Sequence, residues 1–361
     1  MAQGQNAADA SSGDAGQSWT ATTQQQLPSN LNPTRTSESH TQAGGRTVDN
    51  QSIETMGTDG HYSPYLDVQK ETVKVDANTV RTIERSFGRD SDGRKMLVQV
   101  TEEEKRSLPG GEVKVTRSTS DPDANGALQL VQREVQDVRR ISPTVQETKS
   151  TLLTPSSNGG LTASLQTTER ETKTSDHSVE FHKSTSLPDS NGNWQVNEVR
   201  EGTIKDDGKN RTTEESVLRP GTDGNLSVVE RTVSKESQNS AGEKRATVDT
   251  FASDPSSPAD DLRLEQRVIT LHRKGDDGVE SADKQIEQRN PGQPGDGLRV
   301  TEQAIDIVRP GAGGVTRETQ TVRSLDPNGE LGVVSVDTRK QENTPALQVD
   351  MAPAKPQAAG H

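Results

Sequence analysis

Large hydrophobic residues recur along this chain about every 33 residues, each opening a short phrase with the same pattern. A second apolar residue often follows two positions later, and a third lies seven positions after the first, as in Leu128, Leu130 and Val135. Self-similarity at a fixed period is typical of an array or a solenoid. The nine phrases begin at Leu66, Met96, Leu128, Leu161, Trp194, Leu226, Leu262, Leu298 and Leu331. The recurrence predicts one repeated structural unit.

Each unit has a second arm with fewer apolar residues, such as VKVTRSTS from Val113. Between this arm and the next phrase a proline is followed by Asn-Gly or Asp-Gly, as in Pro122 with Asn125-Gly126. Such dipeptides between apolar-bearing runs are a strong hairpin signal. The arms are rich in Val, Thr and Ile, which suit strands. The pattern therefore predicts an all-β fold, an elongated array of antiparallel β-hairpins with roughly 16 to 18 strands.

A helical interpretation also fits some arms, because Leu128, Val131, Val135 and Val138 form a helical stripe. The period is that of ankyrin repeats as well. The chain nevertheless lacks a T-P-L-H signature, and turn residues flank each arm after about 10 to 14 residues. Strands are therefore favoured over helices.

The apolar spacing within a phrase is unusual for a strand. The step from the second to the third apolar position is five residues, an odd number, so the apolar side would change faces midway. A β-bulge would restore the original face. Alternatively, each strand buries its two ends on opposite faces of a twisted sheet.

Composition divides the chain into three parts. Residues 1–64 form a polar, low-complexity segment predicted to be disordered, with isolated Trp19 and Tyr62. Residues 65–343 hold the repeats, and the Pro/Ala-rich tail at 344–361 is predicted to be disordered. Only 26% of residues are hydrophobic and 2% are aromatic. This supply favours a thin, solvated array, with a mostly disordered chain as the alternative.

Charge and residue usage exclude several classes of protein. The net charge is −13, and basic residues are interspersed with acidic ones, which disfavours nucleic acid and anionic lipid as partners. The absence of cysteine excludes disulfides and thiolate chemistry. No apolar run of about 18 residues is present, so no segment is expected to span a bilayer.

Few residues suggest site chemistry, and we predict no catalytic, cofactor or metal site. Asp121-Pro122-Asp123-Ala124-Asn125-Gly126 matches the opening of a calcium loop, but position twelve is Gln132, so a hairpin turn is the favoured interpretation. His177 and His182 are expected on opposite strand faces, which disfavours zinc.

Enzymatic activity is not expected either, because the chain has no nucleophile elbow, no phosphate loop and few aromatic residues to form a substrate pocket. Trp194 stands where sister units carry leucine, which indicates a core anchor. Together with Phe181 it is the one aromatic candidate for a ligand contact.

Two motifs, Val229-Glu230-Arg231-Thr232-Val233 and Asp326-Pro327-Asn328-Gly329, resemble those of uncharacterised exported bacterial β-strand repeat proteins. The resemblance implies a secreted or cell-surface setting and no known activity. We expect a non-enzymatic structural protein of the envelope or exterior: a spacer, fibre subunit or matrix component that forms homo-oligomers or filaments through open strand edges. The alternative is an adhesin or ligand-binding module that uses the extended sheet face.

Overall fold

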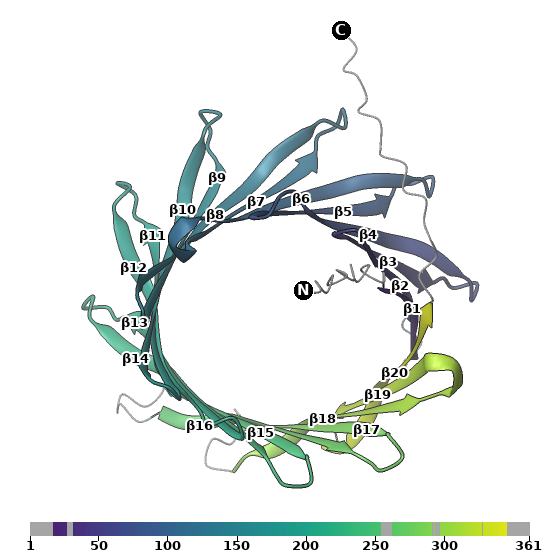
Figure 1. The fold of residues 1–361 in the computed structure, drawn as a ribbon. Coiled ribbons are helices and arrows are strands. Elements are labelled where there is room, and N and C mark those ends of the chain that lie inside the picture. Colours follow the sequence, from purple (N-terminus) through teal and green to yellow (C-terminus); the bar gives the residue numbers. More distant parts are fainter. Residues whose placement is uncertain are drawn as a thin grey trace, which may run out of the picture.

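The computed structural model describes residues 17–26, 32–253, 262–290, 292, 297–326 and 328–344, which form one closed β-barrel of twenty strands (Figure 1). The first ten strands are β1 (Gln17–Gln26), β2 (Thr34–Ala43), β3 (Arg46–Met56), β4 (Tyr62–Lys74), β5 (Thr79–Arg89), β6 (Lys95–Ser107), β7 (Val113–Pro122), β8 (Leu128–Ser142), β9 (Val145–Pro155) and β10 (Leu161–Ser175). The last ten are β11 (Ser178–Pro188), β12 (Trp194–Asp206), β13 (Asn210–Pro220), β14 (Leu226–Gln238), β15 (Lys244–Ser253), β16 (Leu262–Lys274), β17 (Glu280–Gln288), β18 (Arg299–Pro310), β19 (Val315–Leu325) and β20 (Leu331–Thr344). Short 3-10 turns, η1 (Pro109–Gly111) and η2 (Ala312–Gly314), precede β7 and β19.

Neighbouring strands are antiparallel, and the first strand closes the ring. Thr20 of β1 lies opposite Ser39 of β2 on one side and opposite Glu342 of β20 on the other. The all-β, antiparallel hairpin prediction is correct, but the predicted elongated array is wrong. Antiparallel strands in a sheet are tilted and twisted, and closure pairs the two end strands that an open array would leave exposed. Because each of the described strands has two partners, the predicted filament through open strand edges is also wrong.

Strands begin well before the predicted repeat region. Three of them, β1, β2 and β3, lie within residues 1–64, which were predicted to be disordered. These strands are rich in Thr, Ser and Gln and carry few apolar residues, so hydrophobic periodicity does not reveal them. They are held by backbone pairing to neighbours, which a polar sequence can supply equally well. The predicted tail at 344–361 lies, apart from Thr344, outside the described residues.

A β-bulge explains the odd spacing of the apolar positions. In β8, Leu130 pairs with Ser120 and Gln132 pairs with Thr119, so Val131 is the extra residue. Leu130 and Val135 therefore share one face of the sheet despite their odd separation. The same irregularity recurs in every even-numbered strand from β4 to β20. Of the two explanations offered by the sequence, the bulge is confirmed.

The bulges also correct the first two anchors. In units such as β8 the anchor lies three residues before the bulge, at Leu128. The same position in the first two units is taken by Tyr62 and Lys95 rather than by Leu66 and Met96. The repeat begins with a less apolar residue there, so the large aliphatic side chains of these two units stand out of register with the other anchors.

The wall of the barrel is a single layer with little interior. Among the described residues the buried apolar side chains are Ala21, Val100, Val199 and Val217, and the buried polar one is Thr79. The chain therefore relies on backbone ladders and cross-strand pairs more than on a packed core. The small number of buried apolar side chains agrees with the low content of hydrophobic residues in the chain.

The two ends of the barrel differ in their turns. Those between an odd strand and the next even strand include the predicted Asn-Gly sequences, at 123–127, 156–160 and 189–193, and we call this end the Asn-Gly end. In the turn before β12, Gly192 has a φ of +83°, which a glycine adopts without the steric cost of a Cβ. Hairpins at this end curve outward from the ring (Figure 1).

Candidate functional site: the lumen wall

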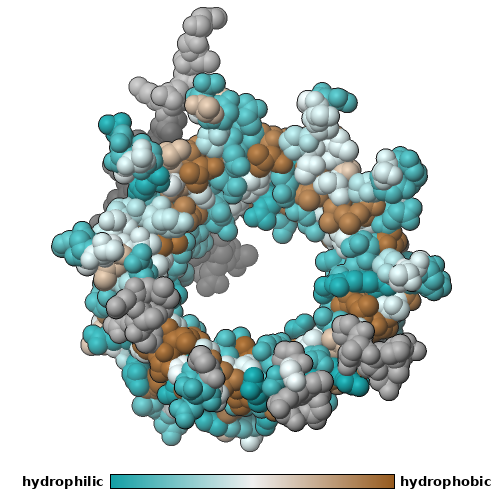
Figure 2. Space-filling view, turned by 180° about the vertical axis from the view of Figure 1, so that it is seen from behind, coloured by the Kyte–Doolittle hydropathy of each residue, from teal (hydrophilic) through white to brown (hydrophobic). Residues whose placement is uncertain are grey.

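The barrel encloses an open lumen, visible from both ends (Figures 1 and 2). Twenty tilted strands spaced about 4.8 Å apart enclose a ring with a backbone diameter of about 40 Å. A barrel of this size leaves a water-accessible channel between its inward side chains. The lumen is therefore the principal concave feature of the molecule.

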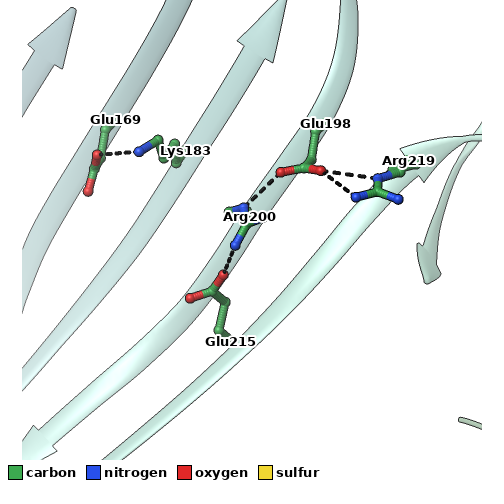
Figure 3. A network of polar contacts seen from close by, with 6 residues as sticks. All are labelled: Glu169, Lys183, Glu198, Arg200, Glu215 and Arg219. Atoms are coloured by element: carbon green, nitrogen blue, oxygen red, sulfur yellow. Dashed lines mark hydrogen bonds and ion pairs between the residues drawn. The ribbon is translucent and has the colours of Figure 1, made fainter. Parts of the chain in front are cut away.

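Two views together establish which face of the wall lines the lumen. In Figure 1 the strands follow one another counterclockwise, and the Asn-Gly hairpins lie at the far, fainter end. In Figure 3, β10 to β13 run from left to right, and Glu215 lies below Arg219, so β13 runs upward toward the Asn-Gly end. These views agree only if the wall in Figure 3 is seen from the lumen. The labelled side chains lie on its near side and therefore face the lumen.

An ion-pair network lines this part of the lumen (Figure 3). Glu198 of β12 accepts hydrogen bonds from Arg200 Nε at 2.7 Å and from Arg219 of β13 at 2.9 and 3.1 Å. Arg200 also donates to Glu215 at 2.9 Å. Arg200 therefore bridges the carboxylates of Glu198 and Glu215. The planar guanidinium group, with its five N–H donors, is well suited to such a bridge. The network crosses two strands and fixes their side chains along the wall.

A row of Glu and Gln residues follows the bulges on the lumen face. Register relative to Glu198 places Glu230, Glu302, Gln132 and Gln266 at the same position of their strands. In the sequence these Glu and Gln residues stand at corresponding places of their repeats, but the sequence alone does not show which face of the sheet they occupy. They place carboxylate and amide groups along the lumen wall.

The opposite, outer face carries the repeat anchors. Leu128, Leu226 and Leu331 lie on this face near the Asn-Gly end and remain 50%, 44% and 38% exposed. Beyond the bulges the outer face also carries charged pairs, such as Arg231 with Glu214 at 3.0 Å. Trp194, at the same position of its unit, was predicted to be a core anchor, but closure as a single layer leaves it 37% exposed. In Figure 2 hydrophobic patches alternate with hydrophilic hairpins around the ring.

A second cluster marks the seam, defined as β1 with its two neighbours β2 and β20. The rings of Trp19 and His40 stack with centroids 5.6 Å apart and planes at 9°, and the guanidinium of Arg339 lies 5.8 Å from the Trp19 ring. Arg339 also pairs with Glu38 at 3.0 Å, and His40 Nδ1 lies 2.6 Å from Asp49 Oδ1. Sequence reasoning set Trp19 aside as isolated. The cluster could not be recognised in the sequence, because Trp19 and Arg339 lie at opposite ends of the chain.

The candidate calcium loop is a hairpin turn. Asp123 Oδ1 accepts the backbone N–H groups of Asn125 and Ala127 at 2.8 and 3.0 Å, and these bonds hold the pKa of Asp123 below its ordinary value. Asp121 instead lies in β7 and accepts from Gln99 at 3.2 Å. Within the described part of the chain no group of three or more His, Asp or Glu side chains is arranged to hold a metal ion.

The other candidate residues lie apart from one another. His177 occupies a turn with Nδ1 2.9 Å from the Asp206 carbonyl oxygen, while His182 on the outer face lies 3.5 Å from Glu201. Trp194 lies on the outer face opposite Pro188, and Phe181 lies on the lumen face opposite Gly202. Trp194 and Phe181 therefore do not form one aromatic contact surface.

Backbone hydrogen bonds also lower the pKa values of turn aspartates. Asp207, in the turn between β12 and β13, has a pKa lowered to about 2 because its carboxylate accepts hydrogen bonds from the Asn210 side chain and from the backbone of Asn210 and Lys209. Such carboxylates stay ionised down to acidic pH. The turns therefore keep their negative charge around both ends of the barrel.

No family model matches the chain, and no curated protein matches it. The chain is similar to two solved structures from Pseudomonas aeruginosa. OccK3 (OpdO) has 10% identity over 92% of this chain and 96% of that one, with a TM-score of 0.46. The siderophore receptor PirA has 11% identity over 92% of this chain and 80% of that one, with a TM-score of 0.47. A mutant of Rh. blastica porin has 9% identity, 91% and 99% coverage and a TM-score of 0.37. These values assign the chain to no family.

Closure overturns several expectations drawn from the sequence. The resemblance to exported β-strand repeat proteins is not supported, because the strands close into a ring instead of forming the open array predicted from the repeats. The roles of spacer, fibre subunit or matrix component, and the alternative of an adhesin using an extended sheet face, all required that open sheet and are wrong.

The lack of a long apolar run bears on helices and not on strands. The described residues contain no helix that is long and apolar enough to cross a membrane. Strands, however, need only about 9–11 residues to do so, and β8 has 15. The expectation that no segment spans a bilayer is therefore not supported, because it rested on the lack of a long apolar run.

Proposed function

We propose that the protein is a wide, water-filled channel of the bacterial cell envelope that admits hydrophilic solutes and carries out no chemistry. The observation that carries this proposal is the closed ring of strands around a polar lumen. Solutes would pass along the Glu/Gln row and the Glu198 network, which offer hydrogen-bonding groups in place of water. The envelope setting and the absence of catalysis are parts of the proposal.

Charge reversal on the two faces tests the path of the solute. Glu230 and Glu302 lie on the lumen face, whereas Glu104 lies on the outer face of β6 opposite Arg81. With the purified protein in a planar lipid bilayer, we expect Glu230→Lys combined with Glu302→Lys to shift the reversal potential in a salt gradient toward anion selectivity. The matched control Glu104→Lys should leave it unchanged, because that charge lies outside the lumen.

Two results would contradict the proposal. The first is the absence of conductance from protein that electron microscopy shows to be intact rings inserted in the bilayer. The second is an equal shift for the lumen and outer variants, because the current would then not follow the lumen.

A further inference from the structure

The ring is closed by the chain's first described strand, and the side chains at that junction form a compact group on one face. Register places Trp19, Glu38, His40 and Asp49 on the lumen face with Arg339. The indole of Trp19 is the shared element, because β1 contributes the ring that contacts both β2 and β20. The Trp19 ring therefore lies where the barrel closes and contacts both neighbouring strands.

Each partner of the indole is held by a carboxylate. Arg339 is held by Glu38 at 3.0 Å, and His40 is held by Asp49 at 2.6 Å. The stacked geometry places the imidazole flat against the indole, where a cationic ring is attracted by the indole π-system. The seam therefore has one permanent cation, Arg339, and one that depends on pH.

Histidine is the side-chain type that carries charge switches near neutral pH, and His40 is the histidine of the seam. The groups facing it are Trp19 from β1, Asp49 from β3, and Glu38 from its own strand; Lys70 of β4 lies opposite Asp49. Protonation turns the contact with Asp49 into a charge-assisted hydrogen bond and the stack on Trp19 into a cation–π contact. Both changes favour the closed seam.

We propose that the seam is a pH-sensitive latch, in which protonated His40 clamps β1 through Trp19 and Asp49 and neutral His40 releases part of that hold. Opening would occur at the β1–β2 and β1–β20 ladders, while the remaining hairpins stay paired through their turns. The latch does not depend on what passes through the lumen, so it stands or falls independently of the channel proposal.

Amide hydrogen exchange on the intact protein tests the latch. Peptides covering β1 and β20 should exchange about tenfold more slowly at pH 5.5 than at pH 7.5, after correction for the intrinsic pH dependence of exchange, an estimate from the strength of exposed cation–π and charge-assisted contacts. Peptides from β10 to β13 should show no such difference. His40→Gln removes the titrating group and should abolish the pH dependence at the seam.

His272→Gln is the matched control, because His272 lies on the lumen face of β16, far along the chain from the seam. It should retain the full pH dependence. Equal protection of β1 at both pH values in the native protein, or pH dependence that persists in His40→Gln, would overturn the latch.

If His40→Gln does not fold, the indole itself supplies the measurement. Trp194→Phe leaves Trp19 as the one tryptophan. Its emission should then change between pH 5.5 and 7.5 as the stacked imidazole loses its proton. Emission that stays constant over this range would count against the proposal.

Discussion

The strongest prediction concerns Gly202, where two strands of the lumen wall approach unusually closely. A Cβ at this position would overlap the backbone carbonyl oxygen of Glu214 in β13 and would lie 2.8 Å from Phe181 Cζ in β11. Gly202→Ala therefore requires β12 and β13 to move apart. Overpacking costs about 1–3 kcal/mol, and weakening one or two ladder hydrogen bonds adds about 1 kcal/mol each, so we expect a loss of about 2–5 kcal/mol.

Gly332 provides the matched control, because it lies on the lumen face of β20 with no atom within 4 Å of its Cβ position. Gly332→Ala should leave stability unchanged or raise it by up to about 1 kcal/mol, since alanine restricts the unfolded chain. Urea unfolding of both variants beside the native protein, followed by circular dichroism, measures the difference. Adding Phe181→Leu to Gly202→Ala should restore part of the loss, because it relieves only the ring contact.

Equal stability of the Gly202 and Gly332 variants would refute the reasoning. It would mean that the wall between β12 and β13 accommodates a methyl group without displacement. The close approach would then have no energetic consequence for the barrel.

Three further outcomes follow from the turns and the wall. Gly192→Ala should lower stability by about 1–2 kcal/mol in urea unfolding, because its φ of +83° is costly for a residue with a Cβ while the space around it is open. The pKa of Asp207 is lowered to about 2, so its ionised form stabilises the native turn above about pH 4. This stabilisation is lost as the pH falls through 2. Asp207→Asn should therefore make the melting temperature less sensitive to acid in this range. Val217→Ala should cost about 1–2 kcal/mol, because Val217 is 3% exposed, whereas Val228→Ala, at 43% exposure, should change unfolding little.

Local features of the fold could be predicted from the sequence, because they depend on neighbouring residues. The Asn-Gly turns, the strand character of the arms and the bulge between Leu130 and Val135 all follow from short-range patterns. Closure does not, because strand tilt and shear are properties of the whole sheet and leave no periodic mark in one repeat. The polar strands β1 to β3 were missed for a related reason, since their pairing relies on backbone groups.

The candidate site was harder to predict than the fold. The Glu and Gln residues that line the lumen, such as Gln132 and Glu302, stand at corresponding places of their repeats, but inside and outside are defined only once the sheet closes. The seam cluster joins Trp19 and Arg339, which are far apart in sequence. Their proximity results from closure of the ring, which no local pattern in the sequence indicates.

The number of repeated units sets the diameter of the ring. Each hairpin unit of about 33 residues contributes two strands. Duplicating or deleting one whole unit therefore preserves the alternation of inward and outward side chains. Gaining a single strand would instead leave the two end strands parallel where the barrel closes. One added unit would widen the backbone ring by about 4 Å. Recombination between repeats within the gene could therefore change the diameter of the encoded barrel in fixed increments.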